Sequence, residues 1–225
     1  SVAEFSEGSR VPVINGGDGA NEHPTQALLD LYTIRSELAD RGRTLDTLRV
    51  AMMGDLKFGR TVHSLSRLLQ LFEGVKVNLV SPPELKMPAE IVDELRAGGH
   101  EVLETDSLEV GIADVDIVYS TRLQEERFTT RAEADAYRGR FRLNQGIYTA
   151  HCEPNTVIMH PLPRDSREGA RELDVDLNDN PNLAIFRQSD NGVLVRMALF
   201  ALILDVVERV DDHSRPVSWY TERRF

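Results

Sequence analysis

The sequence predicts an α/β fold in which a parallel sheet is flanked by helices. Short apolar runs rich in β-branched residues alternate with longer segments whose apolar residues recur at helical spacing, which is typical of helices that connect parallel strands. Most of the apolar runs also end in a cluster of polar residues. Because open α/β sheets bind their ligands at the carboxyl ends of strands, these clusters predict a ligand site along one edge of the sheet.

The expected elements follow one another along the chain. A first strand is expected at 11–15, and the glycine-rich stretch after it leads into a helix at 25–38. Further strands are expected at 48–53, 75–80, 100–103, 116–121 and 156–160, and further helices at 61–72, 88–97, 107–112, 130–137 and 144–150. The run 192–204 is apolar around most of a helix, so this helix needs protein on more than one side. Residues 211–225 are mixed and polar, and they predict a tail.

The amino-acid composition limits the kinds of protein to which this chain can belong. Apolar residues make up 41% and charged residues 28% of 225, which fits one large α/β unit or one domain with part of another. The 26 basic and 37 acidic residues give a net charge of −11, which disfavours nucleic acid and anionic membranes as partners. The sequence shows no bilayer-spanning apolar run and no signal peptide, so we expect a cytoplasmic protein. The lone Cys152 is expected to have a structural role.

Residues 54–61, Gly-Asp-Leu-Lys-Phe-Gly-Arg-Thr, come close to a phosphate-binding loop between a strand and a helix. Arg60 stands where that loop needs lysine, and a wide planar guanidinium is a poor substitute for a slender ammonium between phosphates. The candidate strand 116–121 carries its acid at the start rather than at the end, so an NTPase is disfavoured. Lys57, Arg60 and Thr61 instead begin a helix, where the free N–H groups and the dipole attract an anion.

Three further loops carry polar side chains. His23 and Gln26 follow the glycines of 15–19, although these glycines could mark only a tight turn and a histidine beside a proline is usually structural. Arg122 and Gln124 are two apart, so in an extended chain they face one way and suit a carboxylate. The prolines of 160–164 are expected to hold that segment extended and to aim the carbonyl of its central leucine. Together these loops suit a small dianionic substrate that carries an amine.

Five segments, HPTQALLDLYT, GDLKFGRTVHSLSRLL, STRLQEER, HPLPR and DNGVLVRMALFAL, resemble in this order the catalytic chain of aspartate transcarbamoylase. The resemblance covers about residues 5 to 205. The sister ornithine transcarbamoylases share an HPxQ segment, but resemblance to them would require a cysteine in the HxLP stretch and an Asn-rich GD loop. Pro161 and the residues 57–60 place the chain on the aspartate side.

The resemblance implies a Rossmann-like aspartate-binding domain and a role for each matching residue. His23 would stabilise the oxyanion that forms on carbamoyl phosphate as the amine of aspartate attacks, and Gln26 would hold the carbamoyl amide. Arg60 would bind the α-carboxylate of aspartate, with Lys57 and Thr61 beside it, and Arg122 and Gln124 would bind the β-carboxylate. The backbone carbonyls of Pro161 and Leu162 would orient the carbamoyl NH2. Catalysis would come from holding two reactants in line, without a metal, a cofactor or a covalent intermediate.

The family also uses a Ser-Thr-Arg-Thr loop for the phosphate, a further arginine, and a serine and lysine from a neighbouring subunit. We find no similar loop in this sequence and expect most of the N-terminal carbamoyl-phosphate domain to be missing. The implied division is 1–24 for the end of that domain, 25–188 for the aspartate domain, 189–210 for a helix that returns to the first domain, and 211–225 for a tail. The complete enzyme is expected to be a homotrimer, in some cases with regulatory or dihydroorotase partners.

Several alternatives stay open at this point. The chain could be a fragment, one half of a split enzyme, or a non-catalytic relative that binds a dicarboxylate or a partner subunit. Loss of the phosphate loop would abolish transfer, yet it would leave Arg60, Arg122 and Gln124 to bind aspartate.

Overall fold

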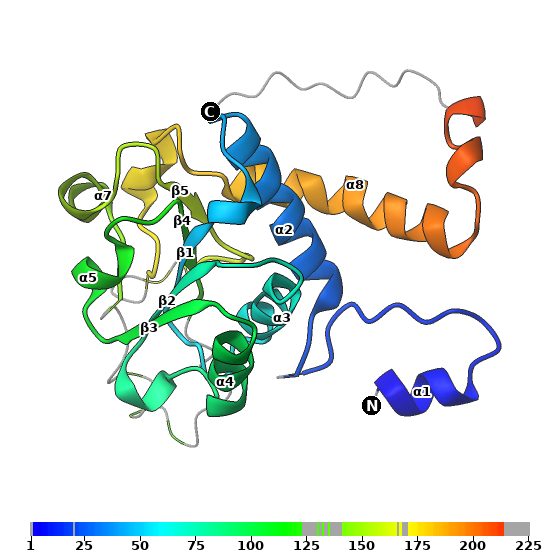
Figure 1. The fold of residues 1–225 in the computed structure, drawn as a ribbon, viewed down its shortest axis with the longest axis horizontal. Helices are drawn as coiled ribbons and strands as arrows, with labels where there is room; N and C mark the ends of the chain where they lie inside the picture. The colour runs from blue at the N-terminus through cyan, green and yellow to red at the C-terminus, as the bar shows by residue number, and fades with distance from the viewer. Residues whose placement is uncertain are drawn as a thin grey trace.

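A five-stranded sheet forms the centre of the protein (Figure 1). The computed structural model describes residues 2–19, 21–122, 141–165 and 171–213, together with residues 130, 132, 135 and 167. The strands are β1 (Arg49–Met53), β2 (Lys76–Val80), β3 (Glu101–Thr105), β4 (Ile117–Ser120) and β5 (Val157–Met159). They pair in parallel in the order β3-β2-β1-β4-β5. The order therefore reverses between β1 and β4, which in such sheets opens a crevice at the carboxyl ends of these two strands.

Helices cover both faces of the sheet. On one face lie α2 (Pro24–Ala39), α3 (Arg60–Leu69) and α4 (Ala89–Ala97), and on the other lie α5 (Leu108–Ile112) and α7 (Gln145–His151). Figure 1 shows α3 and α4 on the opposite side of the strands from α5 and α7. Each crossover returns the chain to the start of the next parallel strand, as the predicted alternation of runs requires.

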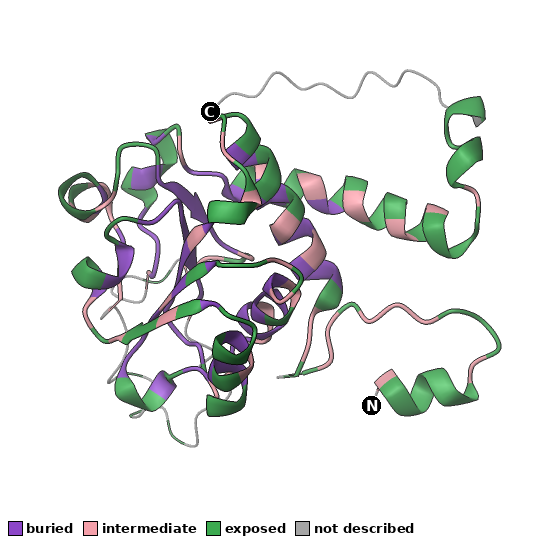
Figure 2. Ribbon diagram, in the orientation of Figure 1, coloured by how far each residue is buried: buried purple, intermediate pink, exposed green. Residues whose placement is uncertain are grey.

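Alternate residues of the strands enter two separate cores. Val50 and Met52 of β1 pack in the core under α2, α3 and α4, whereas Ala51 and Met53 pack in the core under α5 and α7. All four side chains are fully buried, and β1, β4 and β5 are drawn mainly as buried in Figure 2, whereas the edge strand β3 is largely exposed. Burial on both faces explains why the buried strands read as continuous apolar runs rather than alternating ones. Each buried aliphatic side chain of this kind stabilises the fold by about 1.5–3 kcal/mol.

The predicted α/β class is confirmed, and most of the predicted elements are present with shifted ends. The strand expected at 100–103 extends to Thr105, and the helix expected at 61–72 begins at Arg60 and ends at Leu69. The helix expected at 130–137 falls almost entirely outside the described residues.

The strand predicted at 11–15 is wrong. The sheet does not include this segment, and its residues have no regular secondary structure. A strand needs a neighbour for its N–H and C=O groups, and Pro12 has no N–H to donate. The side chain of Asn15 instead accepts a hydrogen bond from the backbone N–H of Gly17 at 2.8 Å, which closes a turn.

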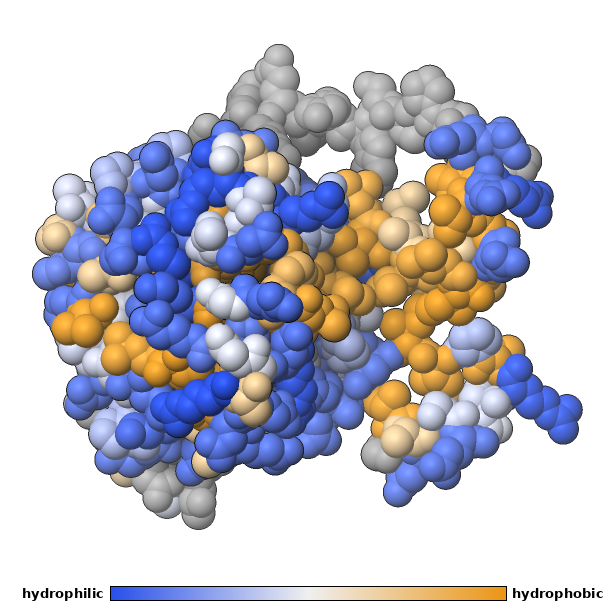
Figure 3. Space-filling model, in the orientation of Figure 1, coloured by the Kyte–Doolittle hydropathy of each residue, from blue (hydrophilic) through white to orange (hydrophobic). Residues whose placement is uncertain are grey.

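A long helix, α8 (Ile185–Ile203), leaves the body of the protein. It begins seven residues before the apolar run 192–204 that predicted it. The first turn of the helix packs against the body of the protein, where its residues Ile185 and Gln188 are buried. Beyond Gly192 its apolar side chains are largely exposed, and Figure 3 shows them as a hydrophobic band beside the body of the protein. The exposed large apolar residues of this region are Val193, Leu194, Met197, Phe200, Leu202, Ile203, Leu204, Val207 and Val210.

The remaining described segments are short. A first helix, α1 (Val2–Gly8), buries no residue, and single turns of 3-10 helix lie at Val207–Arg209 and Asp211–His213. Cys152 is half-buried, and burial raises the pKa of its thiol to about 12, so it stays protonated and a poor nucleophile. None of the helices that the structure describes is both long and apolar enough to cross a membrane. The described residues also hold no group of three His, Cys, Asp or Glu side chains placed to bind a metal ion.

Candidate functional site

A cavity of about 370 Å³ opens at the carboxyl ends of β1, β4 and β5, where the strand order reverses. Four segments that are far apart in the sequence contribute to its wall. The lining residues are Gly19, His23, Gln26, Gly59, Arg60, Thr61, Thr121, Arg122, His160, Pro161, Leu162 and Pro163. Seven of the residues predicted for the site are therefore brought together here: His23, Gln26, Arg60, Thr61, Arg122, Pro161 and Leu162.

Two predicted site residues are not among the lining residues. Lys57 is exposed, and its ammonium lies 5.3 Å from the centre of the Phe58 ring, outside the wall of the cavity. Gln124 lies outside the described residues.

The ends of β1 and β4 approach each other closely at the floor of the cavity. Gly54 has a φ of 107°, and a Cβ at this position would lie 2.4 Å from the carbonyl oxygen of Thr121. The backbone N–H and the hydroxyl of Thr121 both donate to the carbonyl of Met53, at 2.9 and 3.0 Å. Only glycine combines this backbone conformation with this approach, so the two strand ends are held at a fixed separation.

Arg60 is the first residue of α3, and its guanidinium lies over the glycine-rich loop that precedes α2. Its Nη1 donates to the carbonyl of Gly19 at 3.2 Å. Gly17 has a φ of 117°, and a Cβ there would lie 3.0 Å from Arg60 Cζ. The absence of a side chain at Gly17 therefore makes room for the guanidinium, which stands as a cation at a helix start that already favours anions.

His23 precedes α2 and is held by its backbone rather than by its ring. Its N–H donates to the hydroxyl of Ser64 in α3 at 2.8 Å, and its Nδ1 lies 3.4 Å from the hydroxyl of Thr25. Burial lowers the pKa of His23 from its ordinary value, and the nearby charges of Arg60 and Arg196 lower it further. The imidazole is therefore neutral at pH 7 and can act as a polar group without carrying a charge.

Gln26 is connected to a buried carboxylate beneath the cavity. Its Nε2 donates to Asp30 Oδ1 at 2.9 Å, Gln188 Nε2 donates to the same oxygen at 2.6 Å, and the Tyr119 hydroxyl donates to Asp30 Oδ2 at 2.7 Å. Burial raises the pKa of Asp30 to about 6, against the effect of these three hydrogen bonds. Burial and the charge of Asp30 also raise the pKa of Tyr119 well above its ordinary value, so the tyrosine remains a donor.

The loop after β5 forms another part of the cavity wall. Leu162 has a φ of 60°, so the prediction that this segment is extended is wrong at its central residue. The physical reason is a tight turn, in which the N–H of Leu162 donates back to His160 Nδ1 at 2.8 Å. His160 Nε2 in turn lies 2.7 Å from a carboxylate oxygen of Glu172, and both residues are buried. Because Nδ1 accepts, the ring proton belongs on Nε2, where it faces Glu172.

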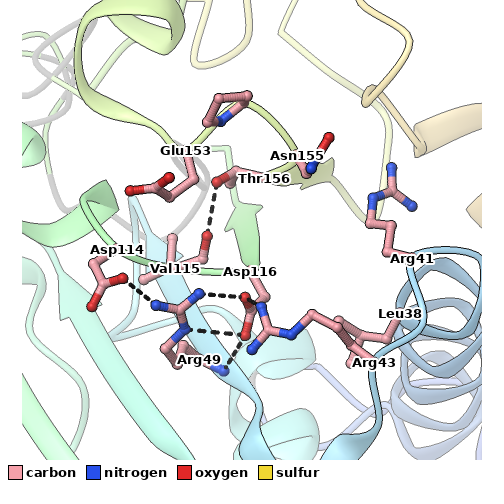
Figure 4. A pocket seen from close by; sticks show the side chains of 11 residues that line it. Leu38, Arg41, Arg43, Arg49, Asp114, Val115, Asp116, Glu153, Asn155 and Thr156 are labelled. Carbon is pink, nitrogen blue, oxygen red and sulfur yellow. Dashed lines mark hydrogen bonds and ion pairs between the residues drawn. The ribbon is translucent and has the colours of Figure 1, made fainter.

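A second cavity, of about 350 Å³, lies at the opposite ends of the strands (Figure 4). Arg41, Arg43 and Arg49 face it, but each is already paired with an acid. Arg49 bonds to Asp116 and Asp114, and Arg43 pairs with Asp116 as well (Figure 4). Arg41 pairs with Glu37. These pairs tie the starts of β1 and β4 to the end of α2, so we assign them to the stability of the fold rather than to a ligand.

The groups that line the first cavity can bind an anionic substrate and stabilise negative charge that forms on it. Arg60 and Arg122 present two separate guanidinium groups, and each can bind a carboxylate or phosphate oxygen pair. The neutral His23 still carries one ring N–H, so it can donate a hydrogen bond to an oxygen that gains negative charge. Backbone carbonyls of the loop after β5 can accept from an NH2 group.

Three functional features of the site were not predicted from the sequence. Thr121 lines the cavity, the carboxylate of Asp30 lies buried beneath it, and Gln188 comes from α8, more than 150 positions from Asp30. Asp30 lies on a helix face between apolar residues, so a buried carboxylate could have been suspected there. The partners of Asp30 carry no local signal, because they are set by the packing of α2 on α8.

The sequence matches two family models. Residues 46–203 match the Asp/Orn binding domain of aspartate/ornithine carbamoyltransferase, and residues 1–36 match the carbamoyl-P binding domain of the same enzymes. The chain is 72% identical over 225 residues to the aspartate carbamoyltransferase catalytic subunit of Saccharophagus degradans, covering 100% of the chain and 67% of that protein. It is 70% identical over 224 residues to the corresponding subunit of Cellvibrio japonicus, covering 100% of the chain and 66% of that protein. The chain thus spans about two thirds of the length of these relatives.

Solved structures show the same fold. The catalytic subunit of the M. jannaschii aspartate transcarbamoylase is 42% identical, with a TM-score of 0.78 over 92% of this chain and 64% of that one. The aspartate transcarbamoylase of Trypanosoma cruzi, in complex with N-(phosphonacetyl)-L-aspartic acid, is 35% identical, with a TM-score of 0.75 over 92% of this chain and 63% of that one.

Proposed function

Because this chain belongs to the aspartate/ornithine carbamoyltransferase family, we propose that it supplies the aspartate-binding part of an aspartate carbamoyltransferase. The enzyme transfers the carbamoyl group of carbamoyl phosphate to the amine of L-aspartate, giving N-carbamoyl-L-aspartate and phosphate, a reaction of pyrimidine biosynthesis. The observation that carries the proposal is the convergence of His23, Arg60 and Arg122 on one cavity at the switch point of the sheet.

The two arginines are assigned to the two carboxylates of aspartate. Arg60 binds the α-carboxylate from the start of α3, and Arg122 binds the β-carboxylate together with Gln124. Two forks in the wall of one cavity hold both ends of a four-carbon dicarboxylate, so the amine between them has one orientation. Thr61 lines the cavity next to Arg60, and Lys57 stays a predicted contributor to the positive field that attracts an anionic ligand.

The remaining polar groups of the cavity wall are assigned to the carbamoyl group. His23 donates to the carbonyl oxygen, and the carbonyls of Pro161 and Leu162 accept from the carbamoyl NH2, with Gln26 beside them. Ornithine, which lacks a second carboxylate, has no partner for Arg122, so the arginine favours aspartate through the cost of leaving its charge unpaired.

The reaction follows from these positions. The amine nitrogen of aspartate attacks the carbamoyl carbon and forms a C–N bond, and the carbonyl electrons move onto the oxygen that faces His23. Collapse of this tetrahedral intermediate breaks the C–O bond to phosphate, and the departing phosphate takes the electron pair and the proton lost by the amine. A neutral His23 stabilises the oxyanion through a hydrogen bond, a contribution that is about 3–4 kcal/mol in comparable sites.

The phosphate is assigned to a part of the enzyme outside these 225 residues, most of its carbamoyl-phosphate domain. The proposed division keeps 1–24 with that domain, 25–188 as the aspartate domain, 189–210 as a returning helix and 211–225 as a tail. The match of 1–36 to the carbamoyl-P binding domain supports a part of that domain at the start of the chain, although this match ends inside α2 and the match of 46–203 to the Asp/Orn binding domain includes all of α8. The exposed apolar outer half of α8 supports a returning helix, because a helix of this kind needs a cover. The homotrimer and the cytoplasmic location expected from the sequence stay predictions.

Carbamoyl-aspartate formation tests the proposal. The folded chain is supplied with carbamoyl phosphate and L-aspartate, alone and with a separately made carbamoyl-phosphate domain of the family. Transfer that needs the added domain supports the division of labour proposed here, and transfer by the chain alone contradicts the assignment of the phosphate elsewhere. If neither mixture reacts, binding of succinate, an unreactive dicarboxylate, separates a relative that only binds a ligand from one with a purely structural role.

A further inference from the structure

Asp30 lies beneath the candidate site and bonds directly to one residue of its wall, Gln26. It belongs to α2 and has no exposed surface. Its Oδ1 accepts from the side-chain amides of Gln26 and Gln188, and its Oδ2 accepts from the Tyr119 hydroxyl. A fully buried carboxylate is costly unless it is satisfied, so three donors converging on one acid indicate a built network.

The first connection fixes the orientation of the Gln26 amide. An ionised carboxylate only accepts hydrogen bonds, so Gln26 must turn its NH2 group toward Asp30. Its oxygen is then the end left for a ligand in the cavity that Gln26 lines. Without an acceptor at Asp30, both ends of the amide become equivalent and the cavity loses a defined acceptor.

The second connection reaches the loop after β5. Gln188 donates to Asp30 with Nε2, and its Oε1 accepts from the backbone N–H of His160 at 2.9 Å. His160 Nδ1 then accepts from the N–H of Leu162, the residue with a φ of 60°. The amide of Gln188 is therefore fixed at both ends, and one carboxylate is linked through Gln188 and His160 to the backbone of Leu162, which lines the cavity.

We propose that Asp30 is a positioning residue that holds Gln26 and the Leu162 backbone in register around the carbamoyl group. This inference rests on the proposed function for the identity of the ligand. The positioning itself is a property of the described residues and can be measured without any substrate. Asp30 lies under Gln26 and does not line the cavity, so it acts through its partners.

Three variants and one control test the network. Asp30→Ala removes the acceptor, and Asp30→Asn keeps an oxygen that both glutamines can reach. Gln188→Met removes the link from Asp30 to His160 and leaves Gln26 and Tyr119 as donors to Asp30. Thr33→Val is the control, because Thr33 is also fully buried in α2 and accepts a hydrogen bond from Asn191 of α8 at 3.0 Å. It thus removes a comparable α2–α8 contact outside the network.

Amide hydrogen exchange in the free chain is the first measurement. Asp30→Ala is expected to speed amide exchange at His160 and Leu162 about tenfold or more relative to Val50 in β1. Asp30→Asn is expected to change the exchange rate at the same two amides less than about threefold. Gln188→Met should speed exchange at the backbone amides of His160 and Leu162. It should leave exchange at the side-chain amide of Gln26 slow, because Gln26 still donates to Asp30. If Asp30→Ala or, where that variant does not fold, Gln188→Met exchanges at these sites like Thr33→Val, the proposed link is wrong.

Transfer kinetics in the complemented enzyme are the second measurement. Asp30→Ala should lower kcat about tenfold or more while the KM for aspartate changes less than about twofold, because Arg60 and Arg122 lie outside the network. Unchanged kcat in a variant with accelerated exchange would overturn the positioning role. If the unaltered chain shows no transfer in any mixture, the proposed function fails, and the exchange comparison still decides whether Asp30 positions Gln26 and Leu162.

Discussion

The guanidinium of Arg60 occupies the space that a side chain at Gly17 would need, with Arg60 Cζ 3.0 Å from an ideal Cβ at that glycine. The two residues belong to different segments, and their contact places a cation over the loop that leads to His23. The glycine therefore matters for where the arginine lies and not only for the turn that it makes.

Gly17→Ala is expected to displace Arg60 and to weaken succinate binding about tenfold, because the far end of a flexible side chain moves more easily than the backbone. The strained φ of 117° should also cost about 1 kcal/mol of stability. Titration calorimetry with succinate measures the affinity. Gly16→Ala in the same loop is the control, since a Cβ there meets nothing within 4 Å, and equal binding by the two variants would contradict the displacement.

Gly54→Ala is expected to destabilise the fold by about 3 kcal/mol or more, since its Cβ would meet the backbone carbonyl of Thr121 at 2.4 Å. A carbonyl in a strand end cannot move aside as a side chain can. Gly74→Ala is the matched control, because Gly74 also has a positive φ, 66°, but open space around it. It should cost only about 1 kcal/mol. Urea unfolding of both variants measures the difference, and similar losses would mean that backbone conformation alone matters at Gly54.

The sequence predicted the parts of the site that depend on local pattern. Strand ends followed by polar residues placed Arg60 and Arg122 at one edge of the sheet, because parallel strands share the direction of their carboxyl ends. His23 lines the same cavity from the start of α2, without the preceding strand that was predicted for it. The run 11–15 shows the limit of that reasoning. Its β-branched residues resemble a strand, yet a strand exists only where a neighbour completes its hydrogen bonds.

The conformation of Leu162 and the partners of Asp30 could not be predicted. Prolines restrict φ on either side of Leu162 but do not exclude the left-handed turn that its bond to His160 Nδ1 favours. The hydrogen bond between Asp30 and Gln188 depends on how α8 crosses α2, which is a property of tertiary packing. Local patterns therefore located the site, whereas its internal geometry required the fold.

Arg122→Ala is expected to weaken succinate binding about 100-fold, the loss of one bidentate bond to a carboxylate. Arg122→Lys keeps the charge without the fork and should lose about tenfold. Arg96→Ala is the control, because Arg96 is an exposed arginine of α4 paired with Glu104 and is absent from the cavity wall. Succinate affinity that is unchanged in Arg122→Ala would remove the β-carboxylate assignment.

The ring of His23 is expected to titrate below its ordinary pKa of 6.5, chiefly because it is buried and partly because Arg60 and Arg196 are near. Its folded form then holds fewer protons than its unfolded form just below pH 6.5, so this group makes the fold less stable as pH falls from 6.5 towards the folded pKa. Above pH 6.5 its contribution to the pH dependence vanishes, and the neutral ring that the oxyanion needs is fully populated. NMR titration of the ring measures the midpoint, and Arg60→Gln should raise it towards 6.5 while Arg96→Gln should not. A midpoint at 6.5 in the unaltered protein would contradict the effect of burial and of the two arginines on His23. A midpoint above about 7 would mean that the ring is mostly charged at neutral pH, and the neutral donor assigned to the oxyanion would be lost.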